Sequence, residues 1–250
     1  MALVVLLLVG MLLTGGAYSL FTSNTTAQAD EYSAADIDAG QKLFVTNCAT
    51  CHGLNAEGSE NGPSLIGVGA AAVDFQVSTG RMPLQMHGPQ AQVKPKQFSD
   101  EETAQMAGYI ASLGPGPAVP DEEWLDTAEG DAAAGGGLFR TNCAMCHNVV
   151  GSGGALTRGK YAPPVIGIEP KHVYEAMETG PQNMPVFNDN NLSPSDKRDV
   201  ITYLETLEET GSPGGISLGS LGPVTEGLYA WTIILSLLLG CAVWLGAKAK

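Results

Sequence analysis

One stretch occurs twice in this chain and constrains the fold more than any other feature. Residues 43–52 (LFVTNCATCH) and 138–147 (LFRTNCAMCH) both end in Cys-x-x-Cys-His. Two thiols three residues apart on one helical turn can add to the two vinyl groups of a single porphyrin, and the adjoining histidine is then held under the iron as an axial ligand. The sequence therefore predicts two covalently bound haem c groups.

Each motif supplies two attachment residues and one iron ligand. These residues are Cys48, Cys51 and His52 for haem 1 and Cys143, Cys146 and His147 for haem 2. A four-thiolate zinc site is the alternative for two Cys-x-x-Cys pairs, but such a site needs no histidine after either pair. The carbonyl groups of Pro63 and Pro163, which follow the motifs, are expected to accept a hydrogen bond from the ligand histidine and so fix its orientation.

The similarity between the two halves extends beyond the motifs. A Leu-Phe pair precedes both motifs, and a Pro-x-x-Ile-Gly segment and a Thr-Gly pair follow both. Such a repeat indicates two homologous units. We expect the first domain at residues 35–113 and the second at 130–208, joined by a linker at 114–129.

Helix signals open and close each unit. Ser33 precedes an acidic first turn, and Ser99 forms a capping box with Glu102 at the start of the last helix of the first unit. In the second unit Ser193 precedes Pro194, a residue favoured at the first helical position. These signals predict helices around the haem motifs.

The repeat also selects the second axial ligand of each iron. Residues 79–83 (TGRMP) correspond to residues 179–185 (TGPQNMP), so Met82 and Met184 stand in matching loops. The proline after each methionine restricts the local backbone. We predict Met82 for haem 1 and Met184 for haem 2, with Met86 as the competitor for haem 1.

The other methionines and histidines that could reach a haem are expected not to bind iron. Met106 and Met177 lie in helical apolar patterns and are expected in the core. His87 and His172 are expected at the surface, with a bis-histidine haem as the alternative.

Two apolar segments predict contact with a membrane. Residues 228–247 are long enough to cross a bilayer core of about 30 Å, with aromatic residues near both ends and lysines beyond them. Residues 1–21 carry no charged side chain and are expected to form a second anchor, with a signal peptide cleaved after residues 27–29 (AQA) as the alternative. A glycine-rich stalk at residues 211–227 leads into the C-terminal span. This arrangement predicts a cytoplasmic C-terminus and haem units on the outer side of the membrane.

The net charge of the chain limits the classes of partner that it can bind. The sequence has 26 acidic and 12 basic residues, a formal net charge of −14, which argues against nucleic acid as a partner. Such acidity keeps an exported domain soluble or steers it towards a basic redox partner. The fifth cysteine, Cys241, lies in the C-terminal apolar run and is expected to pack as a small hydrophobic side chain.

Each unit resembles a class I cytochrome c. Besides the haem motif and the Met-Pro loop, both units share a glycine and an aromatic residue before the motif and a tyrosine near the end. These residues are Gly40, Phe44 and Tyr109 in the first unit and Gly135, Phe139 and Tyr203 in the second. The resemblance implies an all-α fold in which the first and last helices of each domain cross at this glycine–aromatic contact.

The whole chain is similar to the dihaem cytochrome c subunit of the actinobacterial menaquinol–cytochrome c reductase, the cytochrome bcc complex. The similarity lies in five segments: 62–69 (GPSLIGVG), 75–83 (FQVSTGRMP), 159–163 (GKYAP), 179–185 (TGPQNMP) and 222–227 (GPVTEG). It implies a subunit of the bacterial cell membrane that passes electrons from a Rieske iron–sulfur centre through haem 1 and haem 2 to a haem-copper oxidase. The implied partners are a cytochrome b subunit, the Rieske subunit, the oxidase subunits and membrane lipid. The enzyme activity, that of a quinol–cytochrome c oxidoreductase and translocase, belongs to the complex, and the chain itself is an electron carrier.

Two other functions are consistent with two haems on one anchored chain. One is a dihaem electron carrier of another membrane oxidase or dehydrogenase. The other is a dihaem peroxidase, which needs one iron with an open position. The presence of a Met-Pro loop in both units argues against the peroxidase.

Overall fold

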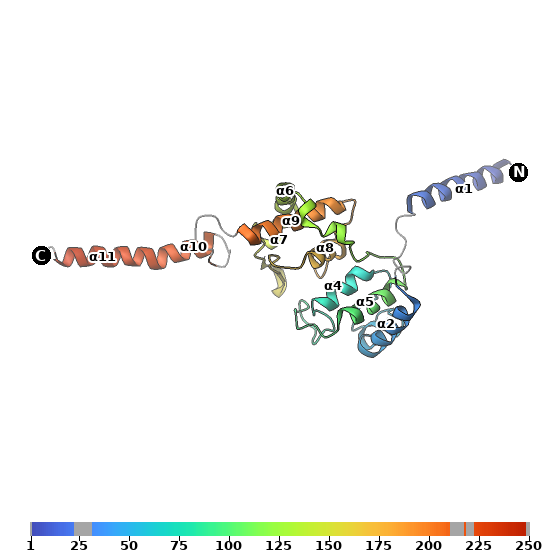
Figure 1. Cartoon of the computed structure of the whole chain (residues 1–250), viewed down its shortest axis with the longest axis horizontal. Helices are drawn as coiled ribbons and strands as arrows, with labels where there is room; N and C mark the ends of the chain where they lie inside the picture. The colour runs from blue at the N-terminus through green and yellow to red at the C-terminus, as the bar shows by residue number, and fades with distance from the viewer. Residues whose placement is uncertain (1, 23–31, 211–217, 219–222, 249–250) are drawn as a thin grey trace. The chain divides into compact units, whose positions relative to one another are not determined.

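The computed structural model describes residues 2–22, 32–210, 218 and 223–248, with side chains described from residue 4 to 16 in the first helix. The described chain is mostly helical, which confirms the predicted all-α class (Figure 1). The predicted cleavage site at residues 27–29 and most of the predicted stalk at 211–227 lie outside the described residues.

The chain divides into two compact units, one formed by Met1–Asp121 with Tyr174–Asn188 and one by Glu122–Val173 with Asp189–Lys250. The repeat in the sequence assigns residues 174–188 to the second domain, whereas their contacts group them with the first unit. One such contact is the hydrogen bond of 3.4 Å from the backbone nitrogen of Ala91 to the side-chain oxygen of Gln182.

The helices of the chain up to the linker are α1 (Ala2–Thr22), α2 (Ala34–Asn47), α3 (Ala49–His52), α4 (Ala70–Ser78) and α5 (Asp100–Ala111). The later helices that surround the second motif are η2 (Glu122–Trp124), η3 (Thr127–Glu129), α6 (Ala132–Asn142), α7 (Ala144–His147), η4 (Thr157–Gly159), α8 (Pro170–Thr179) and α9 (Pro194–Thr210). Two short antiparallel strands, β1 (Gly154–Ala155) and β2 (Tyr161–Ala162), form a hairpin that the sequence did not predict. Their two-residue length leaves no alternating pattern to detect.

The helix starts follow from the predicted capping residues. The Ser33 hydroxyl accepts a hydrogen bond from the Asp36 backbone nitrogen (3.1 Å). Ser99 and Glu102 form the reciprocal pair of a capping box. Each cap satisfies backbone N–H groups that have no partner in the first turn of a helix. The predicted starts of α2 and α5 are therefore confirmed.

In the first unit α2 and α5 pack side by side, and the contact depends on a glycine (Figure 1). A Cβ atom at Gly40 would overlap the carbonyl oxygen of Gln105 on α5, so only glycine lets the two helices approach this closely. One turn further along α2, the ring of Phe44 lies 5.4 Å from the ring of Tyr109 at 49°. This tilted geometry is a favourable one for an aromatic pair.

The second unit repeats this contact between α6 and α9. A Cβ atom at Gly135 would overlap the carbonyl oxygen of Asp199, and the rings of Phe139 and Tyr203 lie 5.6 Å apart at 47°. The helix crossing that the resemblance implied is thus present in both units.

We expect Gly135→Ala to destabilise the second unit by about 3 kcal/mol or more, because overpacking against backbone forces the helices apart. Gly137→Ala, in the same helix, is the matched control, since no atom lies within 4 Å of its added Cβ. Alanine favours a helix over glycine by about 1 kcal/mol, so the control should be neutral or stabilising. Guanidinium unfolding of the haem-loaded protein, followed by haem absorbance, measures both. Equal midpoints for the two variants would contradict the predicted close contact.

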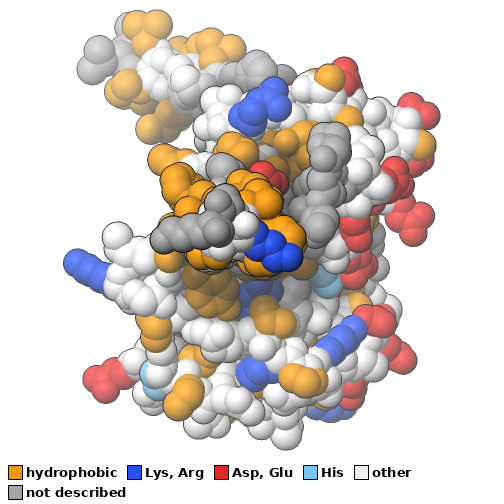
Figure 2. All heavy atoms as spheres, turned by 90° about the vertical axis from the view of Figure 1, so that its left-hand side faces the viewer, with side chains coloured by type: hydrophobic (Ala, Val, Ile, Leu, Met, Phe, Trp, Pro, Cys, Tyr) orange, Lys and Arg blue, Asp and Glu red, His pale blue; other side chains and the backbone are white. Residues whose placement is uncertain are grey.

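The C-terminal segment is a continuous helix built from α10 (Pro223–Tyr229), a π-helical turn η6 (Ala230–Ile234) and α11 (Leu235–Lys248). Within the described residues, the helical stretch Thr225–Lys248 is long and apolar enough to cross a membrane. Figure 2 faces this end of the chain and shows hydrophobic side chains gathered there. The described apolar part of α1, Val4–Gly16, is shorter than a membrane span.

Candidate haem sites

The first haem motif occupies a single helical turn. Cys48 ends α2 and caps α3, and its carbonyl oxygen accepts hydrogen bonds from the backbone nitrogens of Cys51 (3.1 Å) and His52 (3.0 Å). This turn places both thiols and the imidazole on one short segment. Cys48 is half-buried and Cys51 is exposed.

The imidazole of His52 is oriented by the backbone. Its Nδ1 atom lies 2.8 Å from the carbonyl oxygen of Pro63. A carbonyl oxygen only accepts, so Nδ1 carries the proton and Nε2 is left with its lone pair, the form that binds a metal. Gly62 permits this approach, because a Cβ there would lie 2.8 Å from the Cys51 carbonyl oxygen and 3.1 Å from Cε1 of His52.

The second motif has the same geometry. The Cys143 carbonyl oxygen accepts from the backbone nitrogens of Cys146 (3.1 Å) and His147 (2.9 Å). Nδ1 of His147 lies 2.9 Å from the Pro163 carbonyl oxygen. Burial lowers the pKa of His147, and the hydrogen bond to Pro163 opposes this shift in part. Lowering the pKa favours the neutral imidazole, which is the form that coordinates iron.

Burial raises the pKa of the first cysteine of each motif. Burial, with a smaller contribution from Cys51, raises the pKa of the Cys48 thiol to about 11. Burial and Cys146 raise the pKa of Cys143 to about 11 in the same way. The histidine directly after each cysteine pair, which a four-thiolate zinc site does not need, favours covalent attachment to a porphyrin.

The two predicted methionine ligands occupy half-buried positions in loops. The Met82 backbone nitrogen donates to the Gln76 carbonyl oxygen (2.8 Å), and the Met184 nitrogen donates to that of Pro181 (3.0 Å). Met86, the competitor, has 77% of its surface exposed. Iron ligation by Met82 and Met184 stays a prediction.

The roles expected for the other candidates are confirmed except at one residue. Met106 and Met177 are each 2% exposed and belong to the core. His87 is exposed. His172 was expected at the surface, but its side chain is only 14% exposed, and Nδ1 lies 3.6 Å from a carboxylate oxygen of Glu169.

The surroundings of the first motif are apolar, as a porphyrin requires. Phe44, Ala49 and Tyr109 are buried in one cluster, against which Leu65 and Cys48 pack. On the loops that follow the motif the structure exposes further apolar side chains, namely Leu54, Ile66 and Leu84. Cys48, Cys51 and His52 therefore fit covalently bound haem, and Cys143, Cys146 and His147 fit it for the same reasons of local geometry.

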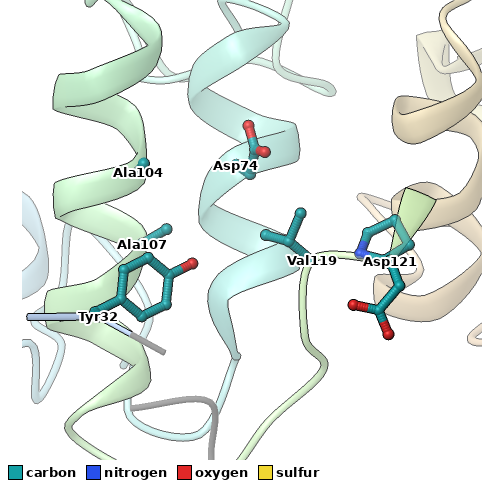
Figure 3. A pocket seen from close by; sticks show the side chains of 7 residues that line it. Tyr32, Asp74, Ala104, Ala107, Val119 and Asp121 are labelled. Atoms are coloured by element: carbon teal, nitrogen blue, oxygen red, sulfur yellow. The ribbon is translucent and has the colours of Figure 1, made fainter. Parts of the chain in front are cut away.

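A separate cavity of about 230 Å³ lies in the first unit between α4, α5 and the linker (Figure 3). Its lining consists of Tyr32, Asp74, Ala104, Ala107, Val119, Pro120 and Asp121. None of the described residues that line this cavity is a cysteine, histidine or methionine, so they offer no ligand for haem iron.

Comparison with known proteins identifies two cytochrome c domains. The sequence profile of the cytochrome c family matches residues 37–114, and that of subunit III of the cbb3-type cytochrome c oxidase matches residues 130–204. The chain is 45% identical over 251 residues to the cytochrome bc1 complex cytochrome c subunit of Mycobacterium leprae, covering 98% of this chain and 87% of that one. It is 44% identical over 239 residues to the subunit of the same name from Corynebacterium efficiens, covering 90% and 80%.

Identity at this level over nearly the whole length of both chains shows common descent rather than a shared domain type alone. Two cytochrome c domains, each with a Cys-x-x-Cys-His turn, account for two covalently bound haem c groups. The chain belongs to the family of cytochrome c subunits of the cytochrome bc1 complex.

Proposed function

We propose that this chain carries electrons from the Rieske iron–sulfur centre of a menaquinol-oxidising complex through haem 1 and haem 2 to a haem-copper terminal oxidase. The observation that carries the proposal is the duplicated ligand geometry. In each unit a histidine on the haem-motif turn is oriented by a proline carbonyl, and a Met-Pro loop is available for the sixth position. Two electron-carrying sites on one anchored chain replace a diffusing carrier.

The residues of the chain hold, orient and shield the two groups. Haem iron supplies one-electron exchange between its ferric and ferrous states, and histidine–methionine ligation raises its reduction potential. Cys48, Cys51, Cys143 and Cys146 form the thioether links, and His52 and His147 are the first axial ligands. Pro63 and Pro163 fix both imidazoles. Met82 and Met184 complete the iron coordination, within domains at residues 35–113 and 130–208.

The proposed orientation in the bacterial cell membrane rests on the C-terminal helix. Lys248 lies at its end, with Nζ 4.8 Å from the ring centre of Trp244. Lysines beyond a membrane span favour the cytoplasmic side. The haem units then lie on the outer side, where the net charge of −14 suits a basic redox partner. Helix α1 is the proposed second anchor.

Purification of the tagged chain from membranes in mild detergent tests the proposal. We expect cytochrome b, the Rieske subunit and oxidase subunits to co-purify, identified by mass spectrometry, which also shows whether residues 1–29 are retained. A variant that ends at Gly227 is the matched control, since it lacks the C-terminal span and should be released from the complex. Recovery of cytochrome b and Rieske subunits without oxidase subunits would contradict the proposed electron route.

A further inference from the structure

Lys94 contacts the loop that carries Met82 from both sides of the methionine. Its ammonium nitrogen donates hydrogen bonds to the carbonyl oxygens of Arg81, at 3.5 Å, and of Pro83. These are the residues directly before and after Met82. No sequence pattern drew attention to Lys94, because it lies in an irregular segment.

The ammonium group of Lys94 has these two carbonyl groups as its hydrogen-bond partners. Lys94 is half-buried, and no carboxylate in the described part of the chain forms an ion pair with it. Its neighbour Lys96 behaves differently, since its ammonium group pairs with the exposed carboxylate of Asp100 on the next helix. A half-buried ammonium group loses part of its hydration, and backbone carbonyl oxygens are then its replacement partners.

The backbone of Lys94 also packs against the start of the Met82 loop, at Gly80. Gly80 has a φ of +69°, and a Cβ there would overlap the Lys94 carbonyl oxygen. On the other side, the Met82 nitrogen is held by the Gln76 carbonyl oxygen at 2.8 Å. The loop is therefore fixed at Gly80, at Arg81, at Met82 and at Pro83.

In the sequence, the loop that carries Met184 has no counterpart of Lys94. The chain from Pro185 to Leu192 is shorter than its counterpart from Pro83 to Phe98 and lacks an equivalent residue. Contacts of this loop include the hydrogen bond from the Phe187 nitrogen to the Met177 carbonyl oxygen (2.7 Å) and the one from the Ala91 nitrogen to the Gln182 side-chain oxygen (3.4 Å). The contact of Lys94 with both neighbours of Met82 therefore has no counterpart in the repeat.

We propose that Lys94 is a positioning residue for haem 1, whose ammonium group clamps the two carbonyl groups around Met82 and so holds the thioether sulfur in place as an iron ligand. The inference rests on the proposed ligation of haem 1 by Met82. Hydrogen bonds from a charged donor are stronger than neutral ones, and a ligand held in place before binding loses less freedom on coordination.

Displacement of the methionine by imidazole tests the clamp. Lys94→Met removes both hydrogen bonds while keeping a long side chain, and Lys96→Met removes the same charge two residues away without touching the loop. Each full-length, haem-loaded variant is titrated with imidazole while the Met–iron charge-transfer band is followed.

We expect Lys94→Met to lose the haem 1 part of the band at an imidazole concentration about tenfold lower than the wild type, because a hydrogen bond to a charged group is lost. Lys96→Met should match the wild type, and Lys94→Arg, which keeps charge and donors, should retain most of the resistance.

The variants separate failure of the clamp from failure of the ligand assignment. If Lys94→Met and Lys96→Met titrate alike while Met82→Ala lacks the haem 1 part of the band, Met82 is the ligand and the clamp is wrong. If Met82→Ala keeps that part of the band, the ligation fails and the clamp fails with it. Should Lys94→Met not acquire haem 1, Lys94→Arg and Lys94→Gln are compared. Greater resistance in the arginine variant supports the clamp, and equal resistance overturns it.

Discussion

Replacement of both Cys143 and Cys146 by alanine is expected to remove haem 2 and to stop electron flow from menaquinol to oxygen, while haem 1 is still reduced. The two thioether links are the only covalent attachment that the second motif offers. Without haem 2 the proposed route has no carrier between haem 1 and the oxidase. Intact-mass measurement of the chain gives the haem content, and an oxygen electrode gives quinol-driven oxygen uptake by the purified complex.

Cys241→Ala is the control for this double variant, because Cys241 lies in the C-terminal helix, outside both motifs. It should keep two haems and the full rate of oxygen uptake. Undiminished oxygen uptake by a double variant that carries one haem would mean that haem 2 is not on the route.

The second large effect is expected from Met82→Ala and Met184→Ala. Each variant should lose the part of the Met–iron charge-transfer band that belongs to one haem. Because the thioether ligand favours ferrous iron, the potential of that haem should fall, on the order of 0.1 V or more within the range of about 0.8 V that axial ligands set. Spectroelectrochemical titration of the full-length protein resolves the two haems.

Met86→Ala is the matched control for the first domain, since Met86 lies in the same loop region but is exposed. It should leave the band and both potentials unchanged. A loss of the haem 1 band in Met86→Ala, with the band intact in Met82→Ala, would reassign the ligand.

Most features that the sequence predicted correctly are local patterns, and several of these occur twice. The haem turns and the cap at Ser99 follow from short motifs read against their copy in the other unit. The cap at Ser33 follows from one local motif, and the crossing at Gly40 and Gly135 follows from the resemblance to class I cytochromes c. A duplicated pattern distinguishes a shared constraint from chance. The repeat therefore did more to locate the candidate site than composition or hydropathy did.

The features that the sequence missed depend on contacts that the repeat does not duplicate. Lys94 reaches the Met82 loop from a segment that has no equivalent in the second unit, so no comparison within the chain could reveal it. The sequence of α8 does not show which segments pack against this helix. It therefore could not predict that His172 is largely buried. The grouping of residues 174–188 with the first unit is likewise a result of packing between distant segments.

Rapid mixing of the fully reduced, purified complex with oxygen tests the proposed route most directly. The c-type haem absorbance is followed in time without any added soluble cytochrome c, for the wild type and for the Cys143→Ala/Cys146→Ala variant. The proposal predicts rapid oxidation of both c-type haems in the wild type, and a haem 1 that stays reduced in the variant. Wild-type c-type haems that remain reduced until soluble cytochrome c is added would contradict the conclusion that this chain connects the quinol-oxidising complex to the oxidase.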